Sequence, residues 1–139
     1  MKAILRTAGI VCLLLTFQIL TVSAADIPLP AKYQLQTRLS MPNLDENLRS
    51  AVNTQKVCIS RVMDLFPVLM QPAFKGCRLG DPSNGAESTY QLFCGSGGGS
   101  GVVKLKKRGD RWIGRLSVKM GGKNMTFSQS VTAEPVGSC

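Results

Sequence analysis

The chain has 139 residues, with 17 Lys and Arg against 8 Asp and Glu, so its formal net charge at pH 7 is +9. It contains five Cys and no His. Without His, serine and cysteine nucleophiles lack their usual general base, and zinc sites lack one of their common ligands. We therefore expect a protein that is not an enzyme and that holds no metal and no cofactor.

The first 24 residues are typical of an export signal. Lys2 and Arg6 supply a positive start, residues 9–22 are largely apolar, and small residues favour cleavage after Ala24. The apolar run is shorter than the ~20 residues of a spanning helix, which argues against a permanent membrane span. Removing residues 1–24 leaves 115 residues, enough for one domain over 25–139. We expect that domain to be periplasmic or secreted.

A half-buried strand is predicted at the start of this domain. Over residues 33–39 apolar and polar side chains alternate, beginning with Tyr33 and Leu35 on the apolar side. Asn43 can cap a short helix, because Glu46 follows three residues later. That helix would carry one apolar face, formed by Leu44, Leu48 and Val52.

The next apolar residues predict a strand around Cys58 and a second short helix. Ser60 can begin this helix, and Pro67 interrupts it because proline has no backbone N–H. Pro72 bounds the following stretch, whose Met and Phe residues we interpret as core rather than as a ligand site.

Further along, turn residues separate two strands that carry cysteines. Asp81–Gly85 is a turn sequence between a strand that carries Cys77 and a strand over Ser88–Cys94. Gly95–Gly101 contains only Gly and Ser and predicts a flexible loop. It lacks the Lys-Ser/Thr ending of a phosphate-binding loop.

A hairpin with a defined register follows, with Gly109-Asp110 as its turn. One face is mostly apolar and pairs Val103 with Leu116, Leu105 with Gly114, and Lys107 with Trp112. The other face pairs Lys104 with Arg115, Lys106 with Ile113, and Arg108 with Arg111. A second turn at 121–124 returns the chain as a strand with Met125, Phe127, Gln129 and Val131 on its apolar side. The sequence thus predicts an antiparallel meander with one solvated face.

Four cysteines, Cys58, Cys77, Cys94 and Cys139, remain after removal of the signal, which contains Cys12. An even number of cysteines in an exported chain predicts disulfides. Three connectivities are open. We favour Cys77 with Cys94, which flank a turn on adjacent strands, and Cys58 with Cys139.

The basic residues of the hairpin form the candidate functional surface. Like charges directly opposite one another destabilise a sheet, so this face must be solvated, screened or occupied by an anion. The candidate anion-binding residues are Lys104, Lys106, Arg108, Arg111, Arg115 and Lys119. The alternative is an edge that only keeps the protein soluble. Nucleic acid is not expected, since the exposed basic strands carry no interleaved aromatic residues.

The order of motifs resembles a family of small exported bacterial proteins known as domain of unknown function 3617. The matching segments are Pro30-Ala31-Lys32-Tyr33, Ser40-Met41-Pro42, Val57-Cys58, Gly76-Cys77, Phe93-Cys94, Gly109–Gly114 and Val136–Cys139. Lys32 stands where the family commonly has Gly. The resemblance implies a periplasmic or secreted β-rich domain and brings no established activity.

Taken together, these features predict a mainly β fold. We expect an antiparallel meander, curved toward a partial barrel, with one or two short helices and two disulfides. We expect a non-enzymatic binding module for an anionic or amphiphilic envelope component, with an anionic lipid or polymer, or an envelope protein, as its partner. The alternative is a small secreted enzyme inhibitor that inserts its Gly95–Gly101 loop into the target.

Overall fold

The computed structural model describes residues 31–41, 52–83, 85–95, 99–121 and 125–139. The predicted export signal, most of the helix expected from Asn43, and the centre of the Gly/Ser loop lie outside these residues.

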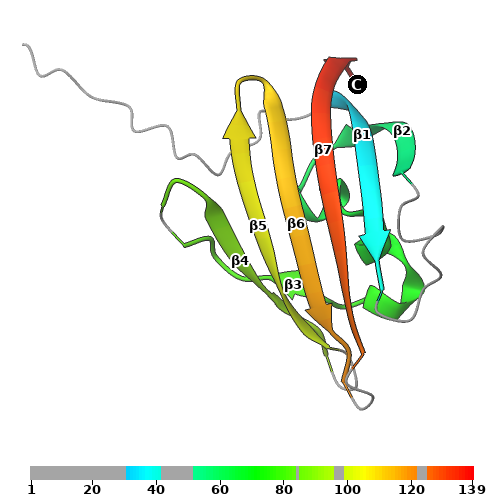
Figure 1. Cartoon of the computed structure of the whole chain (residues 1–139), viewed down its shortest axis with the longest axis vertical. Helices are drawn as coiled ribbons and strands as arrows, with labels where there is room; N and C mark the ends of the chain where they lie inside the picture. The colour runs from blue at the N-terminus through cyan, green and yellow to red at the C-terminus, as the bar shows by residue number, and fades with distance from the viewer. Residues whose placement is uncertain (1–30, 42–51, 84, 96–98, 122–124) are drawn as a thin grey trace, which may run out of the picture.

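Within the described residues, seven strands form one curled antiparallel sheet in the order β2-β1-β7-β6-β5-β4-β3 (Figure 1). The strands are β1 (Ala31–Ser40), β2 (Val52–Ile59), β3 (Arg78–Leu79), β4 (Ser88–Phe93), β5 (Ser100–Arg108), β6 (Arg111–Lys119) and β7 (Thr126–Ser138). From β3 to β7 each strand pairs with the next one in the chain, as a meander does. β7 then pairs with β1, which joins the two ends of the domain. The predicted β-rich meander is confirmed.

Buried and solvent-exposed side chains alternate along the strands, so the sheet has one buried face and one solvated face. In β1, Tyr33, Leu35 and Thr37 are buried, and the residues between them are exposed or half-buried. β6 likewise buries Trp112 and Leu116 on the same side of the sheet. The predicted half-buried strands are therefore confirmed at β1, β6 and β7. On β7 the buried set begins at Phe127, and Met125 before it is exposed, contrary to the prediction.

Three short 3-10 helices cover the buried face of the sheet (Figure 1). They are η1 (Val62–Leu65), η2 (Pro67–Met70) and η3 (Pro72–Phe74). They replace the single helix expected from Ser60, because each proline starts a new turn and has no N–H to continue the previous one. Their apolar residues complete the core, including Leu65, Phe66, Leu69 and Phe74. Met70 is 60% exposed, so the core interpretation is wrong at that residue.

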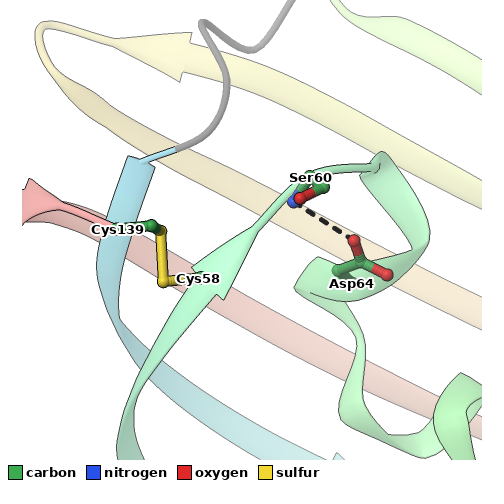
Figure 2. Close-up of a disulfide and its surroundings, with 4 residues drawn as sticks. All are labelled: Cys58, Ser60, Asp64 and Cys139. Atoms are coloured by element: carbon green, nitrogen blue, oxygen red, sulfur yellow. Dashed lines mark hydrogen bonds between the residues drawn. A yellow bond between two sulfur atoms is a disulfide. The ribbon is translucent and has the colours of Figure 1, made fainter.

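Polar contacts hold this covering segment at its start and in its middle. The Asp64 carboxylate accepts hydrogen bonds from the backbone N–H of Ser60 at 3.2 Å (Figure 2) and of Arg61 at 2.8 Å. The Arg61 side chain also donates to Asp64, at 2.9 Å, and this hydrogen bond together with the carboxylate charge raises the pKa of Arg61. On the sheet side, the buried Gln129 accepts a hydrogen bond from the backbone N–H of Val68 at 3.5 Å.

The two disulfides join the pairs of cysteines that we favoured from the sequence. Cys77 and Cys94 lie immediately outside the paired strands β3 and β4, rather than within them. Cys58 in β2 bonds to Cys139, which follows β7 (Figure 2). Since β1 lies between β2 and β7, this second disulfide links the two neighbours of β1 near the point where β1 begins.

Two sequence predictions need correction. Val52 begins β2 opposite Arg38, so it does not belong to a helix. Ser100 and Gly101 belong to β5, so the Gly/Ser loop is shorter than expected. Gly101 fits in the strand because a Cβ atom there would lie 2.6 Å from the Ser117 carbonyl oxygen, an approach that only glycine allows.

A candidate anion-binding face

The predicted hairpin register is confirmed at every pair. Gly109, with a φ of 59°, lies at the turn between β5 and β6, and Arg108 pairs with Arg111 on either side of it. All six candidate basic residues project from the side of the sheet opposite the core. We call that side the polar face. Five of them are exposed, and Lys106, opposite Ile113, is half-buried.

The register places three cations in one line across the sheet. Lys104 on β5 lies directly opposite Arg115 on β6, which lies opposite Ser130 on β7. Ser130 in turn pairs with Arg38 on β1. Directly opposite side chains have Cβ atoms about 5 Å apart, and two strand spacings are about 10 Å. We call Lys104, Arg115, Ser130 and Arg38 the cationic row.

A second line, made of three serines, a glutamine and a valine, runs parallel to the cationic row. It consists of Gln91, Val102, Ser117, Ser128 and Ser40, on β4, β5, β6, β7 and β1 respectively. We call this line the hydroxyl row. A hollow of about 570 Å³ lies over it, and a second hollow of about 330 Å³ is lined by Lys104, Arg115, Val102 and Ser117. The two hollows share Val102 and Ser117 as lining residues, and we refer to them together as the depression.

Carboxylates neutralise the edges of this surface rather than its centre. Arg111 pairs with Glu134 at 3.2 Å, and Lys104 lies 4.0 Å from Glu87. All four side chains are at least 40% exposed, and such surface pairs contribute little free energy. In the part of the chain that the structure describes, no carboxylate pairs with Arg115 or Arg38. The centre of the cationic row thus keeps its positive charge.

Apart from Lys106, the remaining candidate residues lie at the two ends of the hairpin. Arg108 and Arg111 flank its turn, whereas Lys119 lies at the opposite end of β6, between Ser100 and Thr126. Lys107 projects to the other side, where its Nζ lies 5.7 Å from the centre of the Trp112 ring. The structure therefore brings together Lys104 and Arg115, and separates them from Lys119 along the strand.

Sequence reasoning missed Arg38 and the part played by the serines. Arg38 stands on the polar side of the first predicted strand, but no local pattern indicates that this strand pairs with the last one. The alternation of Ser and Thr in residues 126–132 was the available signal for the hydroxyl row.

Comparisons with known proteins identify no relative of this chain. No protein-family model, curated protein or solved structure matches the chain. Among the described residues, no helix has the length and apolar character needed to cross a membrane. Nor do any three His, Cys, Asp or Glu side chains in those residues gather closely enough to hold a metal ion.

Proposed function

We propose that this protein is an exported, non-enzymatic binding module whose polar face binds an anionic component of the bacterial cell envelope. The observation that carries the proposal is the cationic row, in which Lys104, Arg115 and Arg38 lie in one line beside a depression. An arrangement of like charges on adjacent strands is unfavourable by itself, and an anion that binds there relieves the repulsion.

Export is supported by two independent features. The first 24 residues have the features typical of an export signal, and the two disulfides are typical of proteins that fold in an oxidising compartment such as the periplasm. The resemblance to domain of unknown function 3617 points to the same location. We propose a periplasmic or secreted protein on these grounds.

Binding to anionic phospholipid vesicles tests the proposed function. We expect the protein to sediment with vesicles that contain phosphatidylglycerol at low ionic strength and to be released by salt, because exposed charges are screened. Replacing Lys104, Lys106, Arg108 and Arg115 together by Gln should weaken binding at least tenfold, since each basic residue near an anionic surface contributes about 1 kcal/mol.

A control variant with the same net charge isolates the position of the charges. The control replaces four basic residues that do not lie on the polar side of the hairpin: Arg61, Lys75, Arg78 and Lys107. Their replacement by Gln removes the same number of positive charges as the first variant does. We expect this control to retain most of the wild-type binding. Equal binding by wild type and both variants would mean that the basic hairpin only keeps the protein soluble, which contradicts the proposal.

A further inference from the structure

We propose that the ligand of the polar face is a linear acidic polysaccharide that lies across the strands, along the cationic and hydroxyl rows. This inference rests on the proposed function and names the chemistry of its ligand. A membrane surface is the competing anionic partner, and three observations favour the polysaccharide.

The first observation is the linear arrangement of the charges. Lys104 and Arg115 are adjacent, and Arg38 follows two strands further along the same line. Ser130 occupies the position between the two arginines. A chain that carries carboxylates at intervals can meet these cations one after another. A fluid lipid surface gains nothing from cations in one line, because its headgroups rearrange around any distribution of charge.

The second observation is the chemistry of the depression. Its hollow over the hydroxyl row is lined by the hydroxyl and amide groups of Gln91, Ser117, Ser128 and Ser40, together with apolar side chains such as Met41 and Val102. Hydroxyl and amide groups both donate and accept hydrogen bonds. Sugar hydroxyls also do both, whereas phosphate oxygens of lipid headgroups need donors. The short serine side chains also leave room for a sugar ring beside the basic residues.

The third observation is the lack of a membrane-inserting residue in the middle of the polar face. Proteins that lie on membranes combine basic residues with exposed Trp, Phe or Leu that enter the lipid. Here the single Trp, Trp112, is 4% exposed and belongs to the core. Val102 and Ile113, which lie among the basic residues of the hairpin, are half-buried. The exposed apolar side chains lie at the margins of the face: Val52 on the edge strand β2, opposite Arg38, is 51% exposed, and Phe93 at the end of β4 is 48% exposed, with Arg78 over its ring at 5.2 Å.

The test measures binding to polygalacturonate, a linear polymer with one carboxylate on each sugar, by isothermal titration calorimetry. We expect the wild-type protein to bind it in a salt-dependent manner. Replacing Arg38, Lys104 and Arg115 together by Gln should weaken binding at least tenfold. The matched variant, in which Arg61, Lys75 and Lys107 are replaced by Gln, has the same net charge and should bind as the wild type does.

A second variant tests the hydroxyl row without changing the charge. Replacing Ser117 and Ser128 by Ala removes only the hydroxyl groups, from the exposed Ser117 and from the half-buried Ser128. We expect weaker binding to polygalacturonate and unchanged binding to phosphatidylglycerol vesicles. Circular dichroism and thermal unfolding verify that each variant is folded. If the triple charge variant is unfolded, the variant with Ser117 and Ser128 replaced provides the test of the inference.

The outcomes separate this inference from the proposed function. Binding to vesicles without binding to polygalacturonate would overturn the inference and leave the proposed function standing. Binding to neither probe would overturn both. If the two charge variants bind polygalacturonate equally, the attraction comes from net charge alone, and the inference is wrong.

Discussion

At the scale of single residues, Gly114 determines how closely the covering segment packs against the sheet. A Cβ atom at this position would lie 2.8 Å from Cζ of Phe66 and 2.8 Å from Cγ1 of Val131. Phe66 and Val131 are both buried, so neither can move into solvent. We expect Gly114→Ala to lower the free energy of unfolding by about 1–3 kcal/mol, the usual cost of overpacking a core, as measured by urea denaturation.

A second glycine and a compensating substitution serve as controls for this prediction. At Gly85 an added Cβ would make only an ordinary contact, 3.6 Å from the Glu87 carbonyl oxygen, so Gly85→Ala should change the free energy of unfolding by less than about 0.5 kcal/mol. Combining Gly114→Ala with Phe66→Leu should restore part of the loss, because the ring atom nearest to Gly114 is removed. An unchanged urea midpoint for Gly114→Ala would show that Phe66 does not pack on this glycine.

At the scale of elements, the two disulfides constrain very different lengths of chain. Cys77 and Cys94 are 17 residues apart in the sequence, and Cys58 and Cys139 are 81 apart. The entropy of loop closure gives about 3 kcal/mol for the short loop and about 4.5 kcal/mol for the long one. We therefore expect the C58S/C139S variant to lose more unfolding free energy than the C77S/C94S variant in urea denaturation.

The comparison of the two losses of unfolding free energy tests whether loop entropy controls the stabilisation by these disulfides. C58S/C139S also frees the end of β7 and the edge strand β2 from one another, which adds to its cost. A larger loss in C77S/C94S would contradict the prediction and would indicate that strain or local packing, rather than chain entropy, controls these disulfides. A peptide map under non-reducing conditions verifies the pairing in the wild-type protein.

The elements that the sequence predicts well are those determined by neighbouring residues. The register of β5 and β6 follows from one turn and from strict alternation, so each cross-strand pair was predictable. The pairing of β1 with β7 was not, because it joins residues that lie far apart in the sequence. Arg38 therefore joined the candidate site only in the structure. The sequence predicts a helix from Ser60 that Pro67 interrupts, where η1 lies, but not the separate turns η2 and η3 that begin at Pro67 and Pro72.

At the scale of the whole molecule, one curled sheet places the core on one side and the proposed binding surface on the other. The buried side receives the η segment and holds the buried apolar residues of the longer strands. The polar face has no covering element among the described residues, and it carries the cationic row and the depression. Substitutions on the polar face therefore change charge and binding with little effect on packing, which makes the proposed variants suitable for binding measurements.

We expect the two disulfides to make the folded state depend on whether the chain is kept in an oxidising or a reducing compartment. The two disulfides together contribute up to about 7 kcal/mol in the loop-closure model, although the shorter loop lies within the longer one and reduces their sum. Small domains have a total free energy of unfolding of only about 5–15 kcal/mol. The reduced chain should therefore be marginally stable or unfolded at temperatures at which the oxidised chain is folded.

Thermal unfolding followed by circular dichroism, with and without a thiol reductant, measures this dependence. We expect reduction to lower the midpoint by more than 10 °C, since about 1 kcal/mol corresponds to roughly 4 °C in a domain of this size. A variant with Ser in place of Cys58, Cys77, Cys94 and Cys139 should behave in the absence of reductant as the reduced wild type does. If the reduced protein keeps the midpoint of the oxidised form, its core is sufficient alone, and the disulfides do not confine the folded state to an oxidising compartment.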